Sequence, residues 1–525
     1  MHADHGVNTL QRMAVPANPD SIPPVPGPLL RLGAHSVTGW PATLLSLLAG
    51  ATLVLAFAPF DHYLLAPLSL ALWFALLRGA GPRHALRHGY AFGLGLFGAG
   101  ANWIFNSLLI FGEAPLVVAT LITALFVLYL ALYPALLAWI AARLFGRARL
   151  LSWLLALAGG FVLLEALRGW FLSGFPWLLI GHTLLDSPAR GWLPVAGEAG
   201  AGLVVALAAV ALVLLGARRF VAGLVLLAML LASSAGNALW NGLQPAPSAL
   251  RVAIVQGNIE QSRKWADDGI DYALSLYSGL SREAGDVDLL VWPETAIPAF
   301  YFEVYEPLEV LSLDLEAWGT ELVTGIFDYD PATRAMYNSI RHIPSGATYD
   351  KRQLVPFGEF LPFRDRVAWL DRLLDIPMSD LTPGTGSGRV AMAGLVAGLS
   401  VCYEAAYSRR IRAALPEAGF LLNVSNDAWF GDTLAPHQHL QIARVRALEM
   451  GRPLIRATNT GVSALIDADG RLTARAGLFT REVLTGEIQP RQGYTPAARF
   501  GPWPALLVAL LLVLPAGRAR RGRAA

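Results

Sequence analysis

Three polar residues in the second half of the chain stand where strand-like runs end. Glu294 ends the run LLVWPE, Cys402 ends GLSVC, and Lys351 ends the turn-like segment SGATYDK. Strand ends at the edge of a sheet are where α/β folds usually place their chemistry. A thiolate is the reactive form of cysteine, a carboxylate can accept the thiol proton, and an ammonium stabilises the thiolate and the oxyanion of an attacked carbonyl. These residue types therefore predict covalent acyl chemistry, provided that the fold brings them together.

A purely structural interpretation of the same residues stays open at this point. Cys402 is the only cysteine among 525 residues, and an isolated cysteine often acts as a small buried hydrophobic side chain. Lysine and glutamate side chains are usually solvated or paired at the surface. Spacing along the sequence does not show whether the three side chains meet, so both interpretations stand.

The composition of the chain is typical of a membrane protein. Hydrophobic residues make up 55% of the chain and charged residues 15%, and the mean hydropathy is +0.48. Soluble domains average about 45–50% apolar and about 25% charged residues. The net charge of +2 creates no broad positive field, so membrane lipids are expected partners and nucleic acid is not.

Long apolar runs, most of them close to the ~20 residues that cross a bilayer, follow a polar, proline-rich start. Residues 1–40 are expected to form a disordered cytoplasmic leader, and residues 41–242 a transmembrane domain of about seven helices. A last transmembrane helix is expected at 500–517, followed by a basic cytoplasmic tail at 518–525. The individual spans are expected near 42–59, 63–78, 89–110, 115–142, 151–171, 199–217, 220–240 and 502–516.

The distribution of arginine predicts the orientation of these spans. Arginines cluster after the second, fourth, sixth and last spans, whereas the alternate loops, DHYLL and FGEAP, carry none. The positive-inside rule therefore places both termini in the cytoplasm and the segment between the seventh and eighth spans outside. The loop arginines are Arg78, Arg83, Arg87, Arg143, Arg147, Arg149, Arg218 and Arg219.

The outer segment, residues 245–495, has the pattern of an α/β domain. Short runs rich in β-branched residues, such as LRVAIVQGN, DLLVWPE and GFLLNVSN, alternate with amphipathic stretches such as PHQHLQIARVRALE. This alternation is typical of sheets with helices packed outside them. All three candidate residues fall in this segment, which is therefore the predicted catalytic domain.

The motifs around these residues resemble a known superfamily. WPET, YDKRQLVPFGEFLP and VCYE are similar to the Glu–Lys–Cys signature of the nitrilase, or carbon–nitrogen hydrolase, superfamily. QGNIEQSRKW, NVSNDAWFG, RALEMGRPLIRATNTG and GFPW at 174–177, together with the apolar spans, resemble the apolipoprotein N-acyltransferase family over about residues 40–510. The resemblance implies a polytopic α-helical membrane domain of about eight spans and an extracytoplasmic α/β nitrilase-like domain, an α-β-β-α sandwich.

The resemblance also implies roles for the candidate residues. Glu294 becomes the general base, Lys351 the partner of the oxyanion, and Cys402 the nucleophile. Glu359, in PFGE, resembles a fourth polar residue that supports the lysine and the base.

Four further residues are expected near the substrates on the same grounds. Trp265, Tyr403 and Glu404 match residues that line the family's pocket, and their alternatives are a core aromatic, a core tyrosine and an exposed acid. Arg168 is expected either to contact a lipid phosphate or to pair with Glu165 at i,i+3. The apolar segment 367–378 is expected to be either a lid at the membrane surface or an ordinary packed helix.

The implied reaction is N-acylation of the diacylglyceryl-cysteine terminus of a lipoprotein in the bacterial inner membrane. A phospholipid donates its acyl group to Cys402, and the amine of the lipoprotein takes it from the thioester. No cofactor or metal is expected, and HQH at 437–439 is more typical of a helix face than of a metal site. Two alternatives stay open: a membrane-anchored amidase or nitrilase with the same triad, and a transporter or sensor whose outer domain binds a ligand.

Overall fold

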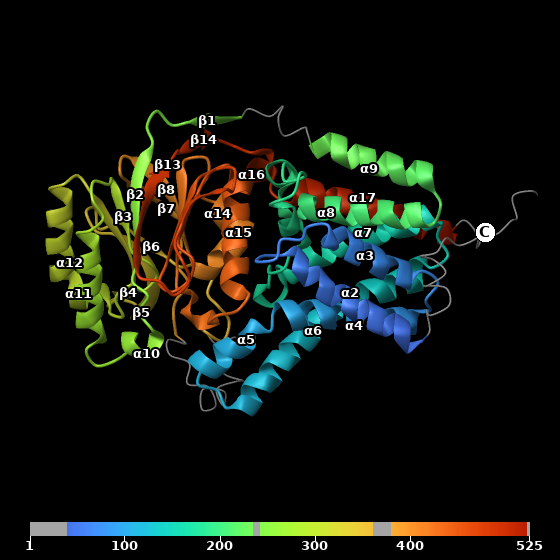
Figure 1. Ribbon diagram of the computed structural model, residues 1–525, viewed down its shortest axis with the longest axis horizontal. Helices are drawn as coiled ribbons and strands as arrows, with labels where there is room; N and C mark the ends of the chain where they lie inside the picture. Colours follow the sequence, from blue (N-terminus) through green and yellow to red (C-terminus); the bar gives the residue numbers. More distant parts are fainter. Residues whose placement is uncertain (1–38, 235–241, 361–379, 522–525) are drawn as a thin grey trace, which may run out of the picture.

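The computed structural model describes residues 39–234, 242–360 and 380–521. A bundle of apolar helices forms one half of the molecule, and an α/β region is packed against one end of it (Figure 1). Most of the predicted leader, half of the predicted tail and the whole of 367–378 lie outside the described residues. The helices of the bundle are α2 (Trp40–Leu53), α3 (Leu65–Leu77), α4 (Pro82–Gly100), α5 (Trp103–Asn106), α6 (Leu116–Phe145), α7 (Leu150–Arg168), α8 (Trp192–Gly216), α9 (Phe220–Ser234) and α17 (Trp503–Arg521).

Several of these helices are long and apolar enough to cross a membrane. α6, α7 and α8 meet this condition alone, and α4 meets it together with the segment Trp103–Ile110, at a bend of 49°. The segments Trp40–Ala56, Leu65–Leu77, Phe220–Leu231 and Trp503–Ala516 are apolar but shorter. A helix of 13 residues is only about 20 Å long, against about 30 Å of hydrocarbon. The predicted helical region therefore has three or four helices long and apolar enough to cross a membrane, and the count of eight spans stays a prediction.

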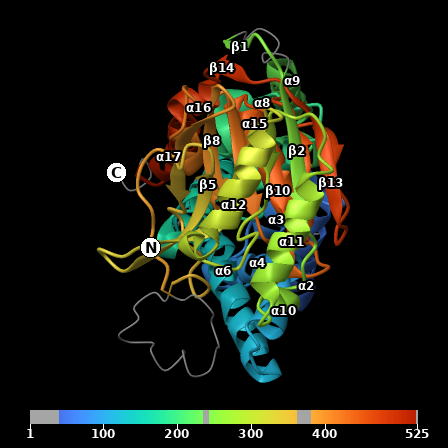
Figure 2. The same cartoon turned by 90° about the vertical axis from the view of Figure 1, so that its left-hand side faces the viewer.

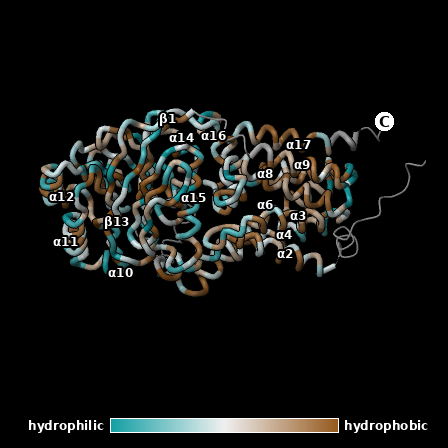
Figure 3. The backbone as a smooth tube through the Cα atoms, turned by 45° about the horizontal axis from the view of Figure 1, so that its top comes forward, coloured by the Kyte–Doolittle hydropathy of each residue, from teal (hydrophilic) through white to brown (hydrophobic). Residues whose placement is uncertain are grey.

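Small residues let the helices of the bundle approach closely. A Cβ atom on Gly50 of α2 would lie 2.0 Å from the carbonyl oxygen of Phe92, and one on Gly95 of α4 would lie 2.0 Å from that of Leu47. Close backbone contact through glycine is the usual way in which helices pack where lipid removes the hydrophobic driving force. Apolar residues dominate the bundle, whereas apolar and polar residues alternate in the α/β region (Figure 3).

The α/β region contains two six-stranded sheets, with the strand orders β13-β2-β3-β4-β5-β6 and β12-β11-β10-β9-β8-β7. The central strands β2, β3 and β4 are parallel, as are β8, β9 and β10. A separate pair, β1 (Leu243–Pro245) with β14 (Arg491–Gly493), links the ends of the region. The strands of the first sheet are β2 (Leu250–Gln256), β3 (Leu289–Val291), β4 (Glu321–Asp330), β5 (Ala335–His342), β6 (Thr348–Asp350) and β13 (Glu482–Ile488). Those of the second are β7 (Arg389–Met392), β8 (Leu395–Val401), β9 (Phe420–Ser425), β10 (Leu454–Thr458), β11 (Ala464–Ile466) and β12 (Leu472–Arg475).

The two sheets pack face to face, with helices on both outer faces. One apolar core contains buried residues from both sheets, among them Val252, Ile254, Leu399 and Leu422. α11 (Gly269–Ser281) and α12 (Tyr301–Glu316) cover the first sheet (Figure 2), whereas α14 (Ser408–Arg412) and α15 (Ala435–Met450) cover the second. The four layers are those of the expected α-β-β-α sandwich.

The arginine-rich loops lie at the end of the bundle that is remote from the sandwich. Arg78, after α3, donates a hydrogen bond of 3.2 Å to the carbonyl oxygen of Ala148, between α6 and α7. The opposite loops touch the sandwich, where Asp186 pairs with Arg444 of α15 at 2.6 Å. Figure 1 shows the same separation of the two ends.

Candidate active site

Cys402 sits at a sharp turn between a strand and a helix. It directly follows β8 and opens the short 3-10 helix Cys402–Ala406. Its φ angle is +51°, in the left-handed region that side chains other than glycine rarely adopt. Such conformations persist only where surrounding contacts hold them, and they concentrate at functional sites. The turn leaves Cys402 only 8% exposed, at the carboxyl end of a central parallel strand.

Lys351 lies between two carboxylates. Its Nζ atom is 2.7 Å from Oε1 of Glu359 and 3.5 Å from Oε1 of Glu294. Glu294 follows the end of β3, Lys351 follows β6, and Glu359 comes from the loop after Lys351. Lys351 is 1% exposed and Glu294 5%, so this pairing is buried. The structure therefore brings together two of the three predicted catalytic residues and the predicted supporting acid.

The charges of Glu294 and Lys351 both act on Cys402. Burial raises the pKa of the Cys402 thiol, the Glu294 carboxylate raises it further, and the Lys351 ammonium lowers it. Burial alone would lower the pKa of Lys351, but Glu359, Glu294 and Cys402 together raise it above its usual value. Lys351 is therefore a permanent cation, while the resting cysteine is a thiol that must lose its proton before it can react.

Two asparagines that the sequence analysis missed hold the carboxylates. Asn338 of β5 donates hydrogen bonds through Nδ2 to Glu294, at 2.7 Å, and to Glu359, at 3.2 Å. The backbone N–H of Asn426 donates to Oε2 of Glu294 at 2.7 Å. Asn426 lies in the motif NVSNDAWFG, which marked the segment, whereas nothing in the sequence marks Asn338.

Glu404 fastens the loop that carries Lys351 to the turn that carries Cys402. Its carboxylate accepts hydrogen bonds from the backbone N–H groups of Arg352 (2.8 Å), Gln353 (2.9 Å) and Val401 (2.8 Å) and from the hydroxyl of Tyr349 (2.8 Å). It is fully buried, so the alternative of an exposed acid is wrong. All of these contacts are with residues close to Lys351 and Cys402 along the chain, so Glu404 holds the two catalytic segments together.

Tyr403 joins the sandwich to the GFPW motif of the helical region. Its ring stacks on Trp177 with 6.1 Å between centroids, and its hydroxyl donates to the carbonyl oxygen of Gly174 at 3.4 Å. Trp177 in turn lies 5.3 Å from Trp103, whose ring meets Phe430 at 4.9 Å. A row of aromatic rings thus begins beside the nucleophile and runs between the two halves of the molecule.

Trp265 and Arg168 occupy different surroundings. Trp265 is 47% exposed, and its ring lies 6.4 Å from that of Phe327. Arg168 is 3% exposed and donates hydrogen bonds to the carbonyl oxygens of Phe175 (2.8 Å) and Trp177 (2.6 Å). Its Nη2 atom also lies 3.6 Å from Oε1 of Glu165, which is the i,i+3 pairing given above as the alternative to lipid contact. Arg168 therefore braces the GFPW loop, and its contact with lipid stays a prediction.

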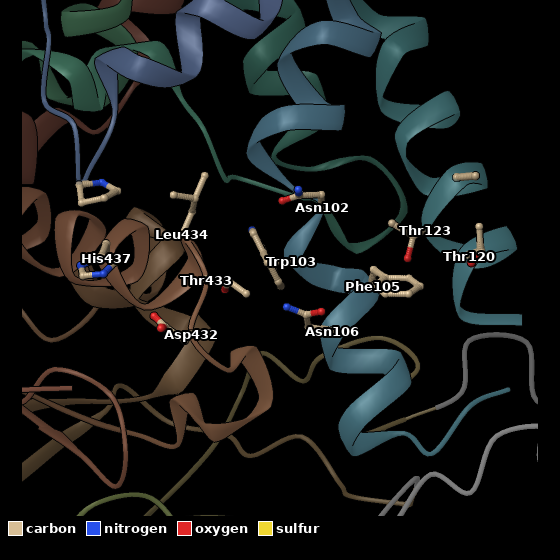
Figure 4. A pocket seen from close by; sticks show the side chains of 12 residues that line it. Asn102, Trp103, Phe105, Asn106, Thr120, Thr123, Asp432, Thr433, Leu434 and His437 are labelled. Atoms are coloured by element: carbon tan, nitrogen blue, oxygen red, sulfur yellow. The ribbon is translucent and has the colours of Figure 1, made fainter. Parts of the chain in front are cut away.

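A pocket of about 720 Å³ opens at the junction of the two halves. Residues of α5 and α6 face residues from the start of α15 and the loop before it (Figure 4). Trp103 lines this pocket and also belongs to the row of aromatic rings. The lining residues are Pro59, Asn102, Trp103, Phe105, Asn106, Thr120, Thr123, Ala124, Asp432, Thr433, Leu434 and His437.

The two histidines of HQH have separate environments. His437 lines the pocket, whereas His439 is fully buried behind the nucleophile, 2.9 Å from Oδ1 of Asp427 and 3.2 Å from the carbonyl oxygen of Cys402. Within the described ranges, no group of three or more His, Cys, Asp or Glu side chains could hold a metal ion.

Comparison with known proteins assigns both halves of the chain. Residues 49–211 match the family model of the apolipoprotein N-acyltransferase N-terminal domain, and residues 251–495 match that of carbon–nitrogen hydrolases. The apolipoprotein N-acyltransferase of Methylococcus capsulatus is 43% identical over 89% of this chain and 94% of the relative. That of Pseudomonas syringae is 40% identical over 90% of this chain and 96% of the relative. The crystal structure of Nit3, a nitrilase-superfamily member from Saccharomyces cerevisiae, is 19% identical, covers 46% of this chain and 90% of that chain, and has a TM-score of 0.35.

Proposed function

The chain belongs to the apolipoprotein N-acyltransferase family, and we propose that it passes an acyl group from a phospholipid to a lipoprotein through Cys402. The relationship makes it a membrane-embedded acyltransferase that N-acylates lipoproteins. The acyl donor, the covalent route and the side of the membrane are what we add. The single observation that carries the covalent route is the cluster of Cys402, Glu294 and Lys351 in one buried site.

The first half of the proposed reaction loads Cys402. Glu294 takes the proton of the thiol, and the thiolate attacks the ester carbonyl of the phospholipid. The carbonyl oxygen becomes an oxyanion, which the permanent charge of Lys351 stabilises. Collapse of this intermediate breaks the bond to the glycerol oxygen, Glu294 returns its proton to that oxygen, and a lysophospholipid leaves.

The second half transfers the acyl group to nitrogen. Glu294 accepts a proton from the α-amine of the diacylglyceryl-cysteine, which attacks the thioester. The thiolate of Cys402 leaves and takes the proton back from Glu294, which restores the resting thiol and carboxylate, and a stable amide remains on the lipoprotein. Asn338 and the N–H of Asn426 hold the carboxylate of Glu294 in one place through both halves.

Two features support lipid substrates presented from the outer side of the inner membrane. The pocket, which both apolar and polar residues line, opens where the apolar bundle meets the catalytic domain, and the aromatic row links it through Trp103 and Trp177 to Tyr403, next to Cys402. The arginine-rich loops lie at the end remote from the sandwich. By the positive-inside rule, that arrangement favours an extracytoplasmic catalytic domain and cytoplasmic termini.

The test separates acyl transfer from hydrolysis by the fate of the acyl group. Purified protein in detergent micelles receives a phospholipid with an isotopically labelled acyl chain and a synthetic diacylglyceryl-cysteine peptide. We expect the label in the N-acylated peptide, with little free fatty acid, as measured by mass spectrometry. Label released mainly as free fatty acid in the presence of the peptide would instead identify a hydrolase that uses water.

A further inference from the structure

The chain uses lysine at only two positions. Among its 40 lysine and arginine residues, only Lys264 and Lys351 are lysines, and both are buried, at 2% and 1% exposure. Lys351 is paired with Glu294 and Glu359. Lys264 makes no side-chain hydrogen bond or ion pair with any residue in the described part of the chain. A compact ammonium was thus placed twice inside one domain, and within residues 39–234, 242–360 and 380–521 only that of Lys351 has a hydrogen-bonding or ion-pairing partner.

Lys264 lies close to the catalytic base. It ends α10 (Gln261–Lys264), and Gln261 of that helix accepts a hydrogen bond of 3.2 Å from the side chain of Asn426. The backbone of Asn426 binds Glu294. Burial lowers the pKa of Lys264 to about 8, and the carboxylate of Glu294 acts in the opposite direction. Trp265, the next residue, is 47% exposed, so the helix ends at the surface of the domain.

The side chain of Lys264 is buried without a hydrogen bond or ion pair to any described residue, and this position needs an explanation. Burial of a charge is unfavourable unless an opposite charge compensates for it. A lysine ammonium is a compact point charge that commonly binds phosphate. The ester donor of the proposed reaction has one such anion, the phosphodiester, separated from the reacting ester by the glycerol carbons. The reacting end of the acceptor is an amine and would be repelled.

We propose that Lys264 is an anion-binding residue that holds the phosphodiester of the phospholipid donor while Cys402 is being acylated. The proposal rests on the proposed function, and it adds a means of distinguishing the donor from the acceptor. All strongly basic residues of the chain other than Lys264 and Lys351 are arginines. An arginine at position 264 would be bulkier and would bind the phosphate through two parallel hydrogen bonds, whereas lysine presents a compact charge.

The experiment compares donors with and without a phosphate. Acylation of Cys402 in a single turnover is followed by intact mass, with a phospholipid and with an uncharged 4-nitrophenyl acyl ester. Loss of a charge-assisted hydrogen bond is worth about 1.5–3 kcal/mol, or about 10- to 150-fold in rate. Lys264→Met should therefore slow acylation by the phospholipid about 10- to 150-fold and acylation by the neutral ester less than about 3-fold.

Two control variants accompany this change. Lys264→Arg keeps the charge and should restore part of the rate with phospholipid. Arg263→Met removes a charge from the same helix, where Arg263 pairs with exposed Asp268 at 2.7 Å, and should change neither rate. If Lys264→Met slowed acylation by both donors equally, the lysine would act through Glu294 or through folding. If it slowed neither reaction, the lysine would bind no anion. Either result overturns the proposal.

A binding measurement tests the same contact without turnover. In Cys402→Ala protein, acetylation of the Lys264 amine by an amine reagent is mapped by peptide mass spectrometry. Phospholipid should protect Lys264, whereas uncharged diacylglycerol should not. Equal protection by both lipids, or by neither, contradicts the proposal. If the wild-type enzyme accepts the neutral ester but no phospholipid, the proposed donor is wrong, independently of Lys264.

Discussion

At the scale of single residues, the site is built around a cysteine that cannot ionise by itself. Burial and the carboxylates of Glu294 and Asp427 raise the pKa of the thiol, whereas Lys351 and, to a smaller extent, a hydrogen bond with Ser425 lower it. The thiolate fraction at neutral pH is therefore small, and the proton must pass to Glu294 at the moment of attack. The fixed positive charge of Lys351 serves both the thiolate and the oxyanion.

These opposed effects predict opposite pH shifts for two variants. Glu294→Gln removes the charge that raises the Cys402 pKa, so alkylation by iodoacetamide should occur at lower pH than in the wild type. Acyl-enzyme formation should nevertheless fall, because no base accepts the proton. Lys351→Met removes the charge that lowers the pKa, so its alkylation profile should shift to higher pH.

The two roles of Lys351 separate at high pH. Alkylation needs only thiolate, so it should recover in Lys351→Met as the pH rises from 6 to 10. Acyl-enzyme formation should stay about 10²- to 10³-fold below the wild type, the usual cost of losing one oxyanion donor. Recovery of both reactions together would mean that Lys351 acts only on the ionisation of the thiol.

Sequence reasoning found the residues with distinctive chemistry and missed their partners. The lone cysteine, the strand ends and the motifs pointed to Cys402, Glu294 and Lys351, which the fold brings together. Asn338 was not found because an asparagine inside a strand has no sequence signal. Lys264 lies in the motif QGNIEQSRKW. The sequence does not show that its side chain is buried without a hydrogen bond or ion pair to the described residues, because this depends on its neighbours in space.

At the scale of elements, the site depends on how the ends of β3, β6 and β8 are tied together. Parallel strands bring their carboxyl ends to one edge of a sheet, so the alternation of strands and helices predicted that such an edge would exist. The pairing of two separate sheets was expected only from the family resemblance and not from the strand pattern itself, because the residues involved are far apart along the chain. Glu404 makes this connection between β8 and the loop after β6.

Glu404→Gln tests this connection. The amide keeps the size of the side chain but places an N–H donor where a carboxylate oxygen accepts from backbone N–H groups. An unsatisfied buried donor costs about 1–3 kcal/mol, so the free energy of unfolding should fall by about that amount, and acylation should slow with it. Thermal unfolding in detergent measures the first effect.

The matched control is Glu417→Gln, because the carboxylate of Glu417 is exposed and pairs with Arg389. This change should have little effect on stability or acylation. Equal effects of the two variants would contradict the role of Glu404.

The helical elements show where hydropathy alone falls short. The run at 89–110 was predicted as one span, but α4 and the segment after it meet at a bend of 49°. The bend turns Trp103 towards Trp177 and Phe430, which hydropathy cannot indicate. The contact of the GFPW loop with Tyr403 likewise joins residues 229 positions apart.

At the scale of the whole molecule, the account requires a fixed orientation in the membrane. A reporter fused after Arg523 should be cytoplasmic, and one inserted near Gly346, in the turn between β5 and β6, should be external. Paired alkaline phosphatase and fluorescent protein fusions measure the side of each. The opposite pair of results would put the catalytic domain in the cytoplasm, away from exported lipoproteins.

The central claim for the whole enzyme is that an acyl group travels on Cys402. The direct measurement is the intact mass of the purified protein after mixing with a phospholipid, before any acceptor is added. Wild-type protein should gain the mass of one acyl chain on the peptide that contains Cys402, and the adduct should disappear when a diacylglyceryl-cysteine peptide is added. Cys402→Ser, which is nearly isosteric but has a much less acidic nucleophile, should fold normally and gain no mass. Transfer to the peptide by the serine variant at the wild-type rate, or by wild-type protein that never carries the adduct, would contradict the account.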